Sequence, residues 1–171
     1  MKFLKTYIRL VDRLSHTVGR LVSVLMPAMV VVLAFEVVAR YVFKRPTIWV
    51  YDLAIFMFGY IGLLAGAYVL KNRQHVNVDI LYDRFSPRQK AISDSLTGLL
   101  FFFLIVLVIR YSLENALFAL ANHESTATEW GPPVGHFKLM IPIGAFLLLL
   151  QGLANWIRAL YRALTDRELE V

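Results

Sequence analysis

The apolar segment between Leu21 and Trp49 constrains the fold of this chain more than any other part of the sequence. No charged residue occurs from Leu21 to Phe35, and Glu36 and Arg40 follow before the segment closes on Trp49. A run of this kind predicts a membrane-spanning helix. A carboxylate or guanidinium inside hydrocarbon costs roughly 2.5 to 3.5 kcal/mol. Because residues four apart share one helix face, we expect Glu36 and Arg40 to neutralise each other.

The composition agrees with a membrane protein. Hydrophobic residues make up 58% of the 171 residues and charged residues 18%, whereas soluble domains carry about 25% charged residues. The sequence has no cysteine, which excludes disulfides and thiolate chemistry. The formal net charge of +6 comes from basic residues that flank the apolar segments. This charge therefore indicates membrane topology and argues against a nucleic-acid partner.

Four apolar segments predict an all-α integral membrane protein, a single domain over 1–171 with four transmembrane helices and antiparallel neighbours. The third helix would be roughly 50 Å long at 1.5 Å per residue, so it must tilt strongly or protrude from the bilayer. The expected spans are 18–43, 48–70, 87–121 and 138–158.

Residues 2–17 alternate basic and apolar side chains at three- and four-residue steps. This pattern predicts an interfacial amphipathic helix that lies on the membrane surface. Anionic membrane lipid is its expected partner, and a protein partner is the alternative. A cleaved signal peptide would need a small-x-small site before Glu36, and the sequence lacks one there, so we expect this segment to be retained.

The basic residues of the loops predict the orientation. Most of them lie in the N-terminal segment, in the loop after the second span and in the C-terminal tail, whereas the opposite side carries Lys44, Arg45 and Lys138. Because cytoplasmic loops hold the excess of Lys and Arg, this asymmetry predicts cytoplasmic termini. The loop 122–138 then faces the outside.

Four sets of motifs follow one another along the predicted spans. They are Arg40-Tyr41-Val42-Phe43 with Pro46 and Trp49, Gly66-Ala67-Tyr68 with His75-Val76-Asn77-Val78-Asp79, Glu124-Ser125 with Trp130-Gly131-Pro132-Pro133, and Lys138-Leu139-Met140-Ile141-Pro142-Ile143-Gly144 with Gln151-Gly152. In this order on four spans, they resemble the small membrane subunit (DctQ-like) of tripartite ATP-independent periplasmic (TRAP) transporters. The motifs after position 120 resemble the mannitol/chloroaromatic-type subgroup. Asp52 stands where the resemblance implies glutamate, so the carboxylate is kept.

The resemblance implies a non-catalytic, multi-pass subunit of the bacterial inner membrane. In such transporters a periplasmic substrate-binding protein captures an organic acid or related solute, and a large permease subunit imports it with a sodium gradient. The small subunit braces the large one. The resemblance implies no cofactor for this chain, and it implies that sodium binds at the large subunit.

The sequence singles out three groups of residues. Glu36 and Arg40 are the structural intramembrane pair; a proton-coupling site is the alternative, which we disfavour because an adjacent cation favours the ionised carboxylate. The subunit-interface candidates are Trp49, Asp52, Gly59, Gly62, Gly66, His75 and Asp79, and the periplasmic-loop candidates are Glu124, Ser125, Trp130, Pro132 and Pro133. For the interface group, the alternatives are glycines that pack within the chain and polar residues that are merely solvated. For the loop group, the alternative is an ordinary turn with an anchoring tryptophan.

A function from another class is a self-sufficient small proton-coupled multidrug exporter, in which Glu36 exchanges protons for a cationic drug. Four spans and a glutamate in the first one favour this hypothesis, whereas Arg40 and the long polar segments oppose it. We expect no enzyme, because no catalytic constellation converges in the sequence. The histidines lie at or beyond the ends of the spans, which argues against a haem.

Overall fold

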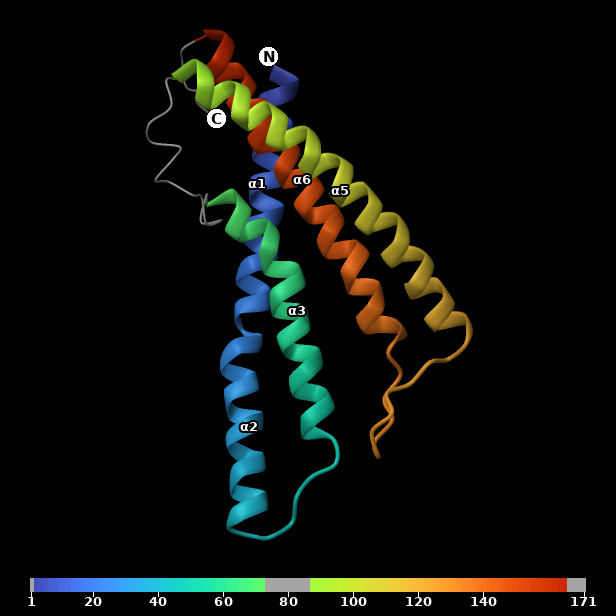
Figure 1. The fold of residues 1–171 in the computed structure, drawn as a ribbon. Coiled ribbons are helices and arrows are strands. Elements are labelled where there is room, and N and C mark those ends of the chain that lie inside the picture. Colours follow the sequence, from blue (N-terminus) through green and yellow to red (C-terminus); the bar gives the residue numbers. More distant parts are fainter. Residues whose placement is uncertain (1, 73–86, 166–171) are drawn as a thin grey trace.

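The computed structural model describes residues 2–72 and 87–165, and within these ranges it is helical (Figure 1). The interface candidates His75 and Asp79 lie outside the described residues. Four helical segments are long and apolar enough to cross a membrane: Phe3–Tyr41, Val50–Lys71, Thr97–Ala121 and Gly135–Tyr161. This confirms the predicted all-α fold class with four transmembrane helices. The helices are α1 (Lys2–Ser23), α2 (Leu25–Tyr41), α3 (Val50–Lys71), α5 (Pro87–Ala121) and α6 (Gly135–Thr165).

The helices α1 and α2 follow one another nearly end to end, with a break at Val24 (Figure 1). The cause of the break is Pro27, which has no amide hydrogen to donate to the carbonyl of Ser23 and whose ring crowds that carbonyl. At the break the Val24 amide donates to the Leu21 carbonyl at 3.3 Å, a three-residue step. The proline lies inside the span expected at 18–43, so the sequence carried the signal for this break.

Together α1 and α2 make a rod longer than a bilayer core. Its apolar segment, Phe3–Tyr41, has 39 residues, which is roughly 58 Å at 1.5 Å per residue. The hydrocarbon core is about 30 Å thick. Part of the rod must therefore tilt or extend beyond the hydrocarbon.

The helices define two ends of the molecule (Figure 1). At the terminal end, α1 begins and α6 ends. At the hairpin end lie the turn between α2 and α3 and the loop between α5 and α6. Each of these two hairpins is antiparallel, but α3 and α6 both run from the hairpin end toward the terminal end. The two central helices, which are distant in sequence, are therefore parallel neighbours.

Packing follows a chain of contacts from one edge of the molecule to the other. Helix α5 packs on α6, α6 packs on α3, and α3 packs on α2 and α1. Glycines allow the closest approaches. A Cβ at Gly144 would lie 2.5 Å from the backbone oxygen of Leu63, and one at Gly152 would lie 2.4 Å from the ring of Phe101. Only glycine fits these positions without moving a neighbour.

One face of α1, the predicted interfacial amphipathic helix, packs on the protein itself. Its residues Ile8 and Val11 are buried and form a small core with Ala154 of α6. The hydroxyl of Tyr7 donates to the backbone oxygen of Leu150 at 3.1 Å. This face of α1 packs on protein because its apolar residues recur at helical spacing opposite the small Ala154. Amphipathicity predicted the apolar face but did not reveal what covers it.

Candidate functional site

Glu36 lies near the end of α2, and hydrogen bonds hold both oxygens of its carboxylate. Arg40 donates from Nε and Nη2 to Oε1 at 2.9 and 2.5 Å. The backbone amide of Thr47 donates to Oε2 at 3.2 Å, and the Thr47 hydroxyl donates to the same oxygen. The structure therefore brings the predicted pair together and adds a third partner. Through Thr47, the pair also fastens the turn that leads into α3.

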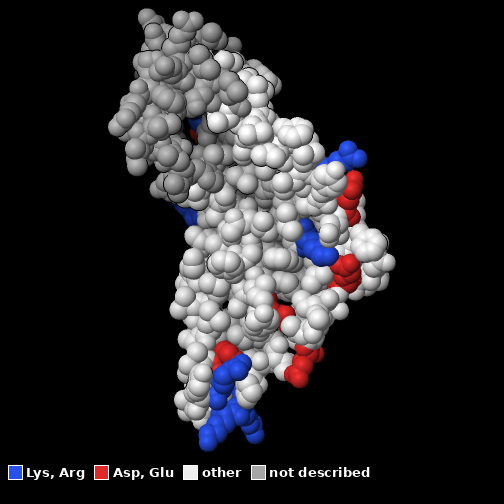
Figure 2. All heavy atoms as spheres, viewed as in Figure 1, with Lys and Arg blue, Asp and Glu red and all other residues white. Residues whose placement is uncertain are grey.

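The α2–α3 turn is a basic tip of the molecule. Basic side chains gather at this end of the surface (Figure 2), and both Lys44 and Arg45 are exposed there. Lys44 adopts a left-handed backbone conformation with φ 53°. The interface candidate Trp49 stacks on Phe35 of α2, with their ring centroids 6.0 Å apart. The structure thus places Trp49 against its own chain.

Asp52, another interface candidate, lies in the first turn of α3 and is 2% exposed. Its Oδ2 accepts a hydrogen bond from the Thr128 hydroxyl at 2.6 Å. A carboxylate at this position is also favoured by the positive end of the helix dipole. The carboxylate of Asp52 is therefore enclosed within the chain, where it holds the α5–α6 loop against α3.

The predicted loop candidates belong to a compact hairpin. Ser125 and Pro133 form an antiparallel bridge. The Thr126 amide donates to the Pro132 oxygen at 3.0 Å. Glu124 pairs with Lys138 of α6 at 2.5 Å. Trp130, Ser125 and Pro133 are exposed, whereas Pro132 is buried and Glu124 is partly buried. The loop therefore presents Trp130 on a fixed framework.

The three candidate glycines of α3 do not share one environment. A Cβ at Gly59 would lie 2.3 Å from the ring of Phe137, and one at Gly66 would lie 3.4 Å from Leu148. Both of these neighbours belong to α6, so Gly59 and Gly66 serve packing within the chain. A Cβ at Gly62 would meet nothing within 4 Å. Gly62 alone faces away from the other described residues.

A polar network at the terminal end escaped the sequence reasoning. Ser15 donates to Oε1 of Gln151 at 2.7 Å, and Gln151 donates to Asp12 at 3.0 Å. Arg158 forms an ion pair with Asp12, and Asn155 donates to the Leu70 oxygen at 2.9 Å. The network joins α1, α6 and α3. The available signal was Gln151 inside an apolar span, because polar residues at such positions seek partners.

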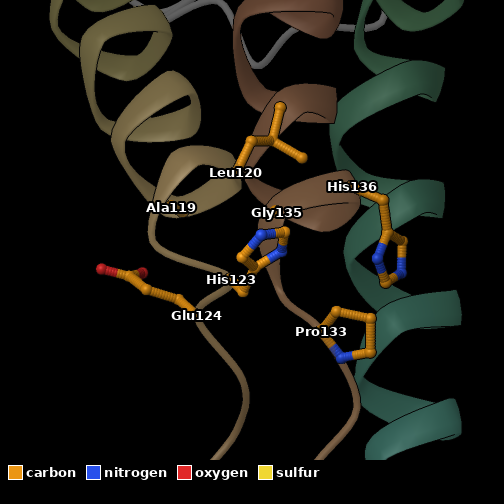
Figure 3. Close-up of a pocket in the computed structure, with 7 residues that line it drawn as sticks. All are labelled: Ala119, Leu120, His123, Glu124, Pro133, Gly135 and His136. Atoms are coloured by element: carbon orange, nitrogen blue, oxygen red, sulfur yellow. The ribbon is translucent and has the colours of Figure 1, made fainter.

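A small cavity of about 170 Å³ lies where α5 passes into the α5–α6 loop (Figure 3). His123 belongs to the loop, and His136 lies in the first turn of α6 (Figure 3). Within the described ranges, no group of three or more His, Cys, Asp or Glu is placed to hold a metal ion. The cavity is lined by Ala119, Leu120, His123, Glu124, Pro133, Gly135 and His136.

The four apolar helical segments, with polar pairs fastening their ends, define a multi-pass helical membrane protein. Residues 29–162 match the family described as "Tripartite ATP-independent periplasmic transporters, DctQ component". The chain therefore belongs to the DctQ family and is a component of a membrane transporter. The resemblance to the small membrane subunit of TRAP transporters is therefore confirmed at the level of the DctQ family.

Individual relatives agree with the family match. The chain is 23% identical over 171 residues to the sialic acid TRAP transporter small permease protein SiaQ of Vibrio cholerae, covering 94% of this chain and 99% of SiaQ. It is 28% identical over 142 residues to the isethionate TRAP transporter permease protein DctMQ of Oleidesulfovibrio alaskensis, covering 78% of this chain. It is 27% identical over 84 residues to the sialic acid TRAP transporter permease protein SiaT of Haemophilus influenzae, covering 49% of this chain. The chain spans 22% of DctMQ and 14% of SiaT.

Proposed function

We propose that this chain is the small subunit that braces the large permease subunit of a TRAP-type transporter in the bacterial inner membrane, with both termini in the cytoplasm. The large subunit imports an organic acid or related solute with a sodium gradient and holds the sodium sites. A periplasmic substrate-binding protein delivers the solute. The observation that carries the proposal is the family match over residues 29–162.

The contacts of Glu36 favour bracing over proton exchange. A carboxylate that exchanges protons for a drug must become accessible and lose its counter-charge during the cycle. In this structure Arg40 and Thr47 hold both carboxylate oxygens, and Thr47 also closes the turn into α3. Releasing Glu36 would therefore remove the two hydrogen bonds that Thr47 donates to it from this turn. These contacts support a structural role and weigh against the self-sufficient exporter.

The resemblance of residues 124–133 and 138–152 to the mannitol/chloroaromatic-type subgroup supports a finer assignment, which we keep as part of the proposal. The relatives illustrate how little such labels constrain the solute. One of them is named for isethionate and two for sialic acid. The solute of the present transporter is therefore best sought in its periplasmic binding protein.

Purification from native membranes tests the proposed role. A tagged chain should co-purify with a large multi-span permease, identified by mass spectrometry. Proteoliposomes that contain both subunits and the binding protein should take up solute only with a sodium gradient. Proteoliposomes that contain this chain alone should show no uptake and no drug-driven proton flux. Transport by the isolated chain would contradict the bracing role and support the exporter.

A further inference from the structure

The helix α1 carries two rows of residues besides the face that packs on α6. The basic row consists of Lys5, Arg9, Arg13 and Arg20, whose separations of four and seven residues place them on one helix face. The apolar row consists of Phe3, Leu10, Leu14 and Leu21, which are 83%, 61%, 42% and 67% exposed. Both rows run along the length of the helix.

The basic row lacks a counter-charge within the described residues. Asp12, the acidic residue of α1, points toward α6 and pairs with Arg158. Arg20 donates to the ring nitrogen of His16 at 3.0 Å, which leaves its positive charge in place. In the part of the chain that the structure describes, Arg9 and Arg13 are exposed and take part in no ion pair. The described residues therefore leave Arg9 and Arg13 exposed and without a counter-charge.

Contacts with α3 place this row at the edge of the apolar zone. Gly19 packs on the side chain of Tyr68, and the rings of His16 and Tyr68 lie 5.8 Å apart. Tyr68 lies one turn before Lys71, where the apolar segment of α3 ends. Arg13 and Arg9, which precede His16 on α1, therefore lie level with this end of α3 or beyond it. Phospholipid headgroups occupy this depth.

We propose that α1 binds the phosphate groups of anionic phospholipids through Arg9 and Arg13, while Leu10 and Leu14, which lie beside them along the helix, insert among the acyl chains. Charge complementarity selects this occupant, because a basic row with no counter-charge among the described residues, beside an exposed apolar row, matches the two parts of an anionic lipid. The hydrogen bond from Ser15 to Gln151 and the Asp12–Arg158 pair connect the lipid-bound helix to α6. Anionic lipid therefore stabilises the packing of α1 on the bundle.

Native mass spectrometry of the purified full-length chain tests this site. The chain in detergent is titrated with phosphatidylglycerol or with phosphatidylcholine of the same acyl chains. We expect preferential retention of phosphatidylglycerol, and an R9Q/R13Q variant should bind it about thirtyfold more weakly, since each basic residue near an anionic headgroup contributes about 1 kcal/mol. The matched control is K44Q/R45Q, which removes two exposed charges at the opposite end and should bind as the parent does. R9K/R13K, which keeps the charge, should retain most of the binding.

Several results would overturn the site. They are equal retention of both lipids by the parent chain, undiminished phosphatidylglycerol binding by R9Q/R13Q, and equal losses in R9Q/R13Q and K44Q/R45Q. Loss of a co-purified protein from R9Q/R13Q with unchanged lipid binding would assign the basic row to a protein partner instead. Because the titration uses the chain alone, its failure leaves the proposed assembly with a large permease subunit untouched.

Discussion

The two ends of the molecule hold their charges in different ways. At the hairpin end, Glu36 pairs with Arg40 four residues away, and Glu124 pairs with Lys138 fourteen residues away. At the terminal end, Asp12 pairs with Arg158, 146 positions along the chain. The ion pairs of the hairpin end therefore lie within single hairpins, and the neutral Thr128 hydroxyl bonds Asp52 across them. At the terminal end an ion pair joins the first helix to the last. Disrupting the terminal end should loosen the whole bundle, and disrupting the hairpin end should act locally.

The largest effect is expected from Arg158→Ala. The change leaves the partly buried carboxylate of Asp12 without its counter-charge, and losing one partner of such a pair costs roughly 3 kcal/mol. The midpoint of thermal unfolding in detergent should fall clearly. D12N/R158Q, which removes both charges, should recover part of the loss. Arg45→Ala removes an exposed charge from the α2–α3 turn, outside the apolar spans, and serves as the control, with an expected loss under about 0.5 kcal/mol. Equal losses in the Arg158 and Arg45 variants would contradict the role of the terminal network.

Next in size is Arg40→Ala at the hairpin end. The single change leaves the Glu36 carboxylate uncompensated in a membrane span, at a cost of roughly 2.5 kcal/mol. The double variant E36Q/R40A removes both charges and should impair the protein less. Recovery of the assembled complex from membranes, or solute uptake, measures the difference. The same loss in the single and double variants would show that neutralising the carboxylate is not what Arg40 contributes.

Between the two ends, Gly144→Ala should disturb the contact of α6 with α3. The added methyl group would meet the backbone oxygen of Leu63 at 2.5 Å, and overpacking of this kind costs about 1 to 3 kcal/mol. Gly62→Ala is the matched control, because its Cβ would point into open space and alanine favours a helix. Thermal unfolding of the isolated chain compares the two. If Gly62→Ala destabilised the intact complex but not the isolated chain, a partner helix would lie at that position.

The smallest effect is expected from Thr128→Val. The change removes the hydroxyl that donates to Asp52, at a cost of about 1 to 2 kcal/mol for the unsatisfied acceptor. Hydrogen exchange should speed up in the loop 122–134 and stay unchanged in α1. Faster exchange in α1 as well would show that the two ends are coupled and would remove the distinction between them.

The sequence predicted contacts between residues close in the chain, but it did not predict contacts between distant ones. The pair of Glu36 and Arg40 was readable because its spacing of four residues matches one helical turn. Its third partner, Thr47, lies across a turn whose path the sequence does not specify. The glycines of α3 were recognisable as small residues, but their spacing left open which helix they meet. The cover of Asp52 was not readable from local spacing, because Thr128, which donates to it, lies 76 positions away.

The sequence by itself determined the all-helical fold class, the four apolar spans and the membership of the transporter family. Hydrocarbon demands long uncharged segments whose backbone bonds are satisfied internally, and this demand is visible in composition alone. Only the tertiary structure decided that α3 and α6 run parallel as neighbours, that α1 packs on α6 and that Asp12 meets Arg158. These choices depend on shape and on partners far apart in the chain, which local spacing does not encode.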